Sequence, residues 1–332
     1  MPTPDEAHRL TEKELAALEK RIAKVYREAR DELSNAIKIY FERFRERDEE
    51  MKALIGTEIN GKVWTEKDYK QWRLNQIGRG KRYQALREKI AQWMTKANEV
   101  SISYVNEATP GIYSLNRNYA AYTIEKVAGN VGFTLWDEAT VRRLIVEEPD
   151  LMPYYPKKKA IKRGIDLKWG KKQITKSVTS GLLQGKSVGK IATDLQARVS
   201  EMNRASAVRA ARTAVTGAQN GGRMDSYKAA RQKGIELQKE WISTLDGQTR
   251  HSHRRLDGEV VEYNEEFSNG CRYPGDPRGK PGEIYNCRCT MVARVKGVDT
   301  SDALRRDRHG VLPDMTFAPW EKQKRGEEYL QK

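Results

Sequence analysis

The sequence has few hydrophobic residues and no long apolar run. Hydrophobic residues make up 38% of its 332 positions, charged residues make up 33%, and the mean hydropathy is −0.83. No stretch approaches the roughly 18 apolar residues that a membrane-spanning helix needs, and the charged start lacks the apolar core of a signal peptide. We therefore expect a soluble protein made in the cytosol, with long solvent-exposed helices in place of one compact globule.

Cysteine is also scarce. The chain has three, an odd number, which excludes a disulfide framework in a chain of this length. All three, with two of the four histidines, lie between residues 241 and 289. These residues are Cys271, Cys287, Cys289, His251 and His253. Groups that can bind a metal, act as nucleophiles or pack in a core are therefore crowded into one segment.

Acidic residues are missing mainly from the middle of the chain. Residues 151–233 hold 19 Lys and Arg against 4 Asp and Glu, a net +15 of the chain's +16. A charge concentrated in this way favours a polyanionic partner, either nucleic acid or an acidic protein surface, over a general role in solubility. The candidate binding residues are Lys157, Lys158, Lys159, Lys162, Arg163, Lys171, Lys172, Arg204, Arg209 and Arg212. Few aromatic residues interleave with them, so neutralisation of phosphates is favoured over base stacking.

Apolar residues recur at steps of three and four through the N-terminal third, which predicts long amphipathic helices. A capping box at Thr11 and Glu14 predicts the first helix start, and Gly56 its end. Further helices are expected from Thr65, from Arg82 to Ala108, from Thr109-Pro110 and from Asp137. In the middle segment, helices are expected up to Leu182, from Ser187 to Val199 and from Asn203 to Lys233.

The pattern of residue types changes after Glu236. Short runs of β-favouring residues at 239–245, 259–263 and 290–295 alternate there with Gly-containing turns. We predict an α+β fold, with elongated, mainly α-helical N-terminal and middle regions and a small C-terminal α+β module. The expected parts are a long-helix, partner-binding domain (1–150), a basic helical segment (151–233), the α+β module (234–297) and a tail (298–332).

A long mixed motif in the module carries a resemblance. Its residues are Trp241, Asp246, Arg250, His253, Asp257, Gly258, Asn286, Cys287 and Cys289, with Pro274-Gly-Asp-Pro277 between them. This pattern, with Gly181-Leu-Leu-Gln-Gly-Lys-Ser187 and Ala211-Arg-Thr213 before it, resembles the phage Mu F-like family of minor head (head morphogenesis) proteins over about residues 165–295. One departure is Ala214, which stands where the family often has glutamate, so no role resting on that carboxylate is carried over.

The resemblance implies a minor capsid protein of a tailed bacteriophage, inside the virion head at the portal vertex and in the host cytoplasm during assembly. It implies a part in head assembly and in DNA packaging or delivery. The expected partners are the portal protein, a scaffold or major capsid protein, and double-stranded DNA. No membrane, small-molecule substrate or enzymatic activity is expected.

The His/Cys cluster leaves three hypotheses open. In the first, His253, Cys287 and Cys289 bind zinc, with Cys271 or His251 as a fourth ligand, because imidazole and thiolate are ligands that zinc prefers. In the second, the same groups are hydrogen-bonded or buried without further chemistry.

The third hypothesis is catalysis. Cys287 and His253 would form a nucleophile–base pair. Alternatively, the two histidines with Asp246 would bind the metal of a nuclease.

Overall fold

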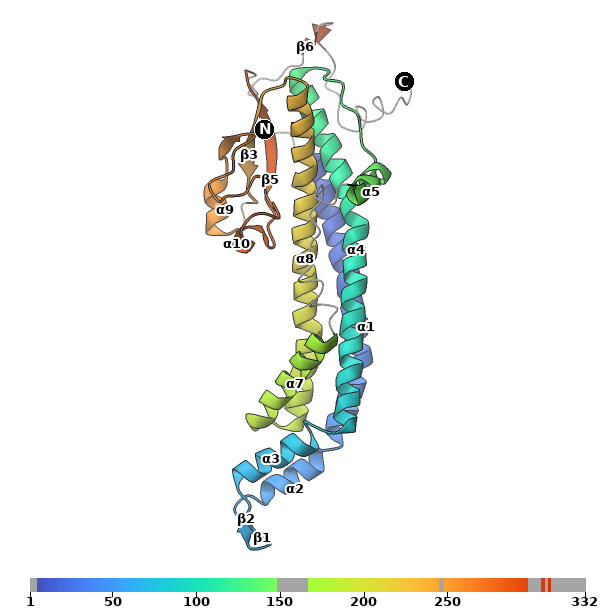
Figure 1. Cartoon of the computed structure of the whole chain (residues 1–332), viewed down its shortest axis with the longest axis vertical. Coiled ribbons are helices and arrows are strands. Elements are labelled where there is room, and N and C mark those ends of the chain that lie inside the picture. The colour runs from blue at the N-terminus through green and yellow to red at the C-terminus, as the bar shows by residue number, and fades with distance from the viewer. Residues whose placement is uncertain (1–4, 148–166, 245–247, 298–305, 308–309, 312–332) are drawn as a thin grey trace. The chain divides into compact units, whose positions relative to one another are not determined.

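The computed structural model describes residues 5–147, 167–244, 248–297, 306–307 and 310–311 (Figure 1). The chain divides into two compact units, each assembled from separate stretches. Unit 1 comprises residues 1–18, 105–157 and 209–332, and unit 2 comprises residues 19–104 and 158–208. The boundary falls inside three helices, α1 (Glu6–Glu42), α4 (Lys81–Ala128) and α8 (Val188–Gln232).

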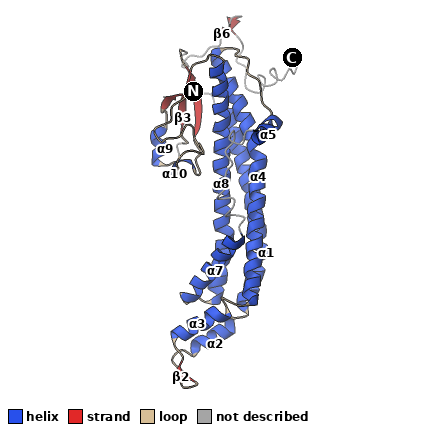
Figure 2. Ribbon diagram, viewed as in Figure 1, coloured by secondary structure: helices blue, strands red, loops and turns tan. Residues whose placement is uncertain are grey.

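Unit 2 is built almost entirely of helices (Figure 2). Besides its parts of α1, α4 and α8 it contains α2 (Arg45–Ala53), α3 (Glu66–Gln76) and α7 (Leu167–Leu183), and a hairpin of β1 (Glu58–Ile59) and β2 (Lys62–Val63). Its core gathers apolar side chains from these helices, among them Ile37, Ile90, Val178 and Ile191.

The α7–α8 corner explains the first part of the sequence motif. A Cβ at Gly181 would lie 2.9 Å from the Ile191 side chain, so glycine lets the two helices approach closely. Gly185 ends α7 with a φ of +70°, and Ser187 Oγ accepts a hydrogen bond from Lys190 N at 3.2 Å. Ser187 therefore caps α8, as predicted.

Unit 1 combines the remaining parts of α1, α4 and α8 with a small sheet and short helices. The sheet is antiparallel, in the order β4 (Val260–Glu262), β3 (Leu237–Ile242), β5 (Thr290–Val295), with Trp241 paired to Met291. The short helices are α5 (Glu138–Glu147), α9 (His251–Leu256) and α10 (Pro281–Ile284), and β6 (Arg306–Asp307) pairs with β7 (Gly310–Val311). Burial alternates along β3, because one face of the sheet packs inward.

The structure confirms the α+β class, with long helices and a small C-terminal sheet. The capping box at Thr65 is present, and Asp137 Oδ1 accepts from Thr140 N at 2.7 Å at the start of α5. The division into four consecutive parts stays a prediction, and the compact units group the described residues differently. None of the described helices carries an apolar stretch that could cross a bilayer.

Four predicted helix boundaries are wrong. Helix α1 ends at Glu42 and not at Gly56, because the chain turns at residues 43–44 and a separate helix, α2, begins at Arg45. Helix α1 begins at Glu6, where Asp5 Oδ1 accepts from His8 N at 2.9 Å, and Thr11 lies inside the helix. Helix α4 continues through Pro110, and α8 is one helix where two were predicted around residue 200. In α4, buried residues on both sides of Pro110, such as Val105 and Ile112, keep the helix continuous because tertiary packing outweighs the local preference of proline.

Candidate functional site

One face of α8 in unit 1 is polar and buried. Its polar side chains recur every three or four positions, so they share one side of the helix. They are Thr213, Thr216, Gln219, Asn220 and Arg223. Buried polar groups are unfavourable unless they are hydrogen-bonded, so the partners of this face define what α8 holds in place.

The first partners belong to the run Asn286-Cys-Arg-Cys289. Thr213 Oγ1 accepts a hydrogen bond from Asn286 N at 2.9 Å. Thr216 Oγ1 donates to Cys287 O at 2.6 Å. Both contacts involve backbone groups of the run, so α8 fixes the path of the chain that carries two of the cysteines.

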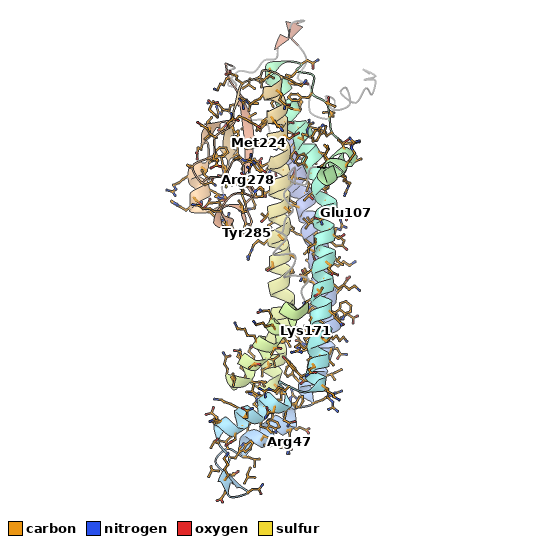
Figure 3. The ribbon with its side chains drawn as sticks, in the orientation of Figure 1. Arg47, Glu107, Lys171, Met224, Arg278 and Tyr285 are labelled. Atoms are coloured by element: carbon orange, nitrogen blue, oxygen red, sulfur yellow. The ribbon has the colours of Figure 1, made fainter. Side chains whose placement is uncertain are left out.

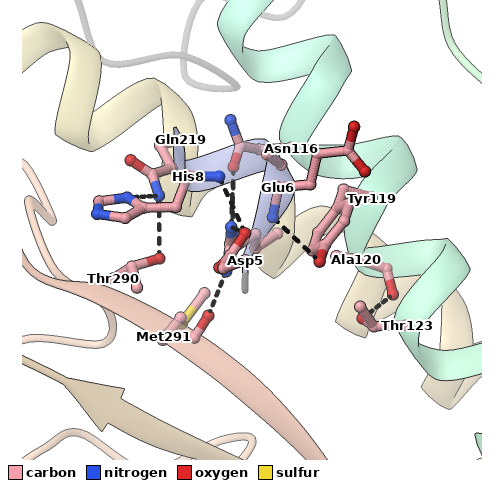
Figure 4. A network of polar contacts seen from close by, with 12 residues as sticks. Asp5, Glu6, His8, Asn116, Tyr119, Ala120, Thr123, Gln219, Thr290 and Met291 are labelled. Atoms are coloured by element: carbon pink, nitrogen blue, oxygen red, sulfur yellow. Dashed lines mark hydrogen bonds and ion pairs between the residues drawn. The ribbon is translucent and has the colours of Figure 1, made fainter. Parts of the chain in front are cut away.

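The hydrogen bonds from this face of α8 continue into β5. Asn220 Nδ2 donates to Cys289 O at 3.2 Å. Gln219 Nε2 donates to Thr290 Oγ1 at 3.0 Å (Figure 4). The register between α8 and β5 is therefore set by specific hydrogen bonds in addition to apolar packing.

Arg223 completes this face and joins four segments. Its Nη1 lies 2.7 Å from Asp5 Oδ2 and donates to Met291 O at 2.9 Å. Its Nη2 donates to Asn116 Oδ1 at 3.1 Å. Burial raises the pKa of Asp5, but the Arg223 guanidinium outweighs it and holds that pKa below its usual value. The start of α1, α4, α8 and β5 thus meet at one buried cation.

The Pro-Gly-Asp-Pro loop packs against α8 as well. Gly275 has a φ of +80°, and a Cβ there would lie 2.9 Å from Gly217 N, so only glycine fits. Asp276 is 1% exposed, and its carboxylate accepts from Arg272 N at 3.1 Å and from Arg278 N at 3.0 Å. The motif is therefore a folded loop with a buried carboxylate at its centre.

The structure brings His253, Cys287 and Cys289 together. Within the described residues they form the one group of histidine, cysteine and carboxylate side chains with metal-binding proximity, their ligand atoms all within 4.8 Å of one another. His253 Nδ1 lies 3.4 Å from Cys289 Sγ and 3.7 Å from Cys287 Sγ. All three residues are buried, with 1–2% of their surface exposed.

The two thiols of this group differ in acidity. The hydrogen bond with Cys289, together with burial, raises the pKa of the Cys287 thiol well above its usual value. The same hydrogen bond, with a second between Cys289 and His253, lowers the pKa of Cys289 against the effect of burial. Cys271 lies outside this group, and burial raises its pKa to about 12.

Residues 172–292 match the family described as Phage Mu protein F like protein. This segment belongs to that family. We call it the Mu F-like region.

Two relatives extend the comparison. Minor head protein GP7 of Bacillus phage SPP1 is 29% identical over 246 residues, which cover 71% of this chain and 77% of that protein. The NAD(+)–arginine ADP-ribosyltransferase EFV of Enterococcus faecalis is 35% identical over 136 residues, which cover 40% of this chain. The chain spans about a quarter (27%) of that transferase. No solved structure matches the chain.

The described motif residues of the Mu F-like region are held in place by burial, hydrogen bonds or backbone conformation. Trp241 is buried, its ring 5.5 Å from that of His253 in an edge-on contact. Asp257 Oδ1 accepts from Ser243 N at 2.8 Å, and Gly258 adopts a φ of +76°. Arg250 Nη2 donates to Tyr285 O. Asp246 lies outside the described residues.

The predicted basic residues fall into three groups. Lys157, Lys158, Lys159, Lys162 and Arg163 lie outside the described residues. Lys171 lies on α7 (Figure 3) and forms an ion pair with Glu88. Lys172 is exposed on the same helix. On α8, Arg204 and Arg209 are exposed, and Arg212 Nη1 donates to Asn286 Oδ1 at 3.4 Å.

The sequence singled out the three residues that the structure brings together, His253, Cys287 and Cys289. The sequence-based predictions did not include the buried polar face of α8 or the carboxylate of Glu283, whose Oε2 lies 3.1 Å from His253 Nε2. A signal for the face exists: Thr213, Thr216 and Asn220 recur at helical spacing in an alanine-rich stretch. The proposed fourth zinc ligands do not join the group, because Cys271 lies outside it and His251 is exposed.

Replacing Asn286 tests how the Mu F-like region holds its cysteines. Asn286 has a φ of +57°, a conformation that asparagine and glycine tolerate and a β-branched residue does not. We expect Asn286→Val to lower the free energy of unfolding by about 1–2 kcal/mol and Asn286→Gly to leave it nearly unchanged. Urea unfolding followed by circular dichroism measures both, and equal losses would contradict the backbone argument.

Proposed function

We propose that this protein is a minor head protein of a tailed bacteriophage that takes part in head morphogenesis. It would act in the virion interior at the portal vertex, after assembly in the host cytoplasm. The observation that carries this proposal is the similarity to minor head protein GP7, which covers 71% of the chain. The Mu F-like region covers little more than a third of the chain, so this similarity extends into the helical part.

The partner surface we propose is basic. Lys172 and Lys176 on α7 and Lys190 on α8 are exposed cations of unit 2, in the segment that holds nearly all of the net charge. Such a surface suits an acidic face of the portal or of another head protein, or the phosphates of packaged DNA.

We also propose that the His/Cys group has no catalytic role. A nucleophilic cysteine needs a lowered pKa and access to substrate. Cys287 is 1% exposed and its pKa is raised, while Cys289, whose pKa is lowered, is 2% exposed. Burial of both thiols supports a structural reading over the alternatives of a metal-dependent nuclease or a Cys/His enzyme.

The assembly proposal predicts incorporation into heads. When the chain is co-expressed with the portal, scaffold and major capsid proteins of the same genome, we expect it to co-purify with portal-containing heads at low copy number. Replacing Lys172 and Lys176 by glutamate is expected to reduce this incorporation or the retention of DNA. Quantitative mass spectrometry of purified heads measures the first effect, and salt titration of DNA binding measures the second.

A matched control separates local charge from net charge. Lys38 and Lys67 are exposed in the nearly neutral N-terminal region, and their replacement by glutamate changes the net charge equally. We expect the control to behave as the unmodified protein does. Absence of the chain from assembled heads would refute the proposed function, and equal effects of the two variants would refute the basic surface.

A further inference from the structure

The buried His253, Cys287 and Cys289 are arranged as ligands around a common centre. Both sulfur atoms face the same imidazole nitrogen, Nδ1, at 3.4 and 3.7 Å. His253 lies on α9, and the two cysteines lie in the segment before β5. Cys287 and Cys289 follow His253 by 34 and 36 residues in the sequence. The helix α8 holds the backbone of the cysteine segment, so the arrangement does not depend on the thiols alone.

These distances fit a tetrahedral zinc site. Zinc binds thiolate sulfur at about 2.3 Å and imidazole nitrogen at about 2.0–2.1 Å, which places tetrahedral N and S ligands about 3.5 Å apart. The two N–S distances in this group lie on either side of that value.

The surroundings of the ligand atoms also suit a metal. A histidine that binds a metal through one ring nitrogen usually donates its other N–H to a carboxylate or carbonyl, which fixes its orientation. Within the described part of the chain, His253 Nε2 is buried without a hydrogen bond, and Glu283 Oε2 lies 3.1 Å from it, so this carboxylate is the acceptor within reach. On the other side, Cys289 N donates to Cys287 Sγ at 3.4 Å, a contact that stabilises a thiolate.

We propose that His253 Nδ1, Cys287 Sγ and Cys289 Sγ bind a zinc ion, with Glu283 as the positioning residue of the histidine. The ion joins α9 to the start of β5 and thereby ties the two ends of the intervening loops together. These three ligands leave one tetrahedral position for a donor that they do not supply.

Metal analysis of the full chain tests this site. We expect protein purified from zinc-containing medium to hold one zinc per chain by elemental mass spectrometry. After chelator treatment, titration with Co²⁺ should produce the thiolate-to-metal charge-transfer absorption of a cysteine-ligated ion. A wild-type chain that is purified without zinc and binds neither Zn²⁺ nor Co²⁺ would overturn the proposal and leave S–H···N hydrogen bonds as the explanation.

Substitutions separate the ligands from their neighbours. Cys287→Ala and Cys289→Ala are expected to lose the zinc, whereas Cys271→Ala, which removes a buried thiol of the same core cluster, should keep it. Zinc retained with unchanged affinity in both ligand variants would refute the assignment.

A milder variant keeps the test valid if the cysteine variants do not fold. Glu283→Gln leaves the three ligands in place and retains a group that can accept from Asn269 Nδ2. Because it weakens the orientation of His253, we expect a 10–100-fold loss of zinc affinity without a change in stoichiometry. An unchanged affinity would remove Glu283 from the site.

Discussion

Replacing Asp48 by alanine is expected to lower the free energy of unfolding by about 3–5 kcal/mol, because it leaves a buried arginine without its counter-ion. Arg73 and Asp48 are 0% and 6% exposed, and Arg73 Nε lies 2.8 Å from Asp48 Oδ1. The guanidinium also donates to Leu182 O at 3.2 Å, so Arg73 of α3 links Asp48 of α2 to the end of α7. Urea unfolding followed by circular dichroism and tryptophan fluorescence gives the free energy.

Two variants control for this prediction. Glu50→Ala breaks the exposed ion pair of Arg47 and Glu50 on the same helix, α2, and should cost less than about 1 kcal/mol. The double replacement Asp48→Ala with Arg73→Met removes both charges and should cost less than Asp48→Ala alone. If Asp48→Ala and Glu50→Ala cost the same, the buried pair does not stabilise unit 2 as described.

Replacing Gly222 by alanine is expected to destabilise unit 1 by about 3 kcal/mol. Helices α4 and α8 pack closely at this glycine, and a Cβ added there would lie 2.4 Å from Tyr113 O and 3.1 Å from Arg117 N. Both atoms belong to the backbone of α4, so the helices must separate to admit one methyl group. Thermal unfolding followed by circular dichroism measures the loss.

The matched control is Gly189→Ala, on the same helix. Gly189 is exposed and a Cβ there meets no atom within 4 Å, so alanine should be neutral or stabilise the helix by up to about 1 kcal/mol. A Gly222→Ala variant as stable as Gly189→Ala would show that α4 and α8 do not approach as closely as the structure places them.

Much of the local structure could be predicted because the signals are local. The hydroxyl of Thr65 and the carboxylate of Asp68 cap a helix within four residues, and a sequence shows such a pair directly. The same holds for the carboxylate of Asp137 and for β5, whose bounds follow from a run of β-favouring residues.

Predictions failed where distant packing decides. Thr11 has the spacing of a cap, but in the structure its hydroxyl donates to Ala7 O inside α1 and its Oγ1 accepts from Asn116, 105 residues away. Proline at 110 predicts a helix start, yet buried neighbours on both sides carry α4 through it. No local pattern reveals these partners.

The candidate site was predictable in part for the same reason. Crowding of cysteine and histidine in one segment indicated the group of His253, Cys287 and Cys289, and the structure brings the three together. The bonds that hold the group to α8, such as that of Thr216 to Cys287, join residues 71 apart. Spacing along the sequence carries no information about that register.

The contacts of Arg223 also bear on how the chain folds as the ribosome makes it. Asp5 leaves the exit tunnel 218 residues before Arg223, and Met291 follows 68 residues later. At a synthesis rate of about 5–20 residues per second, Asp5 is made roughly 15–60 s before Met291. During synthesis the start of α1 therefore lacks its final neighbours until β5 has been translated.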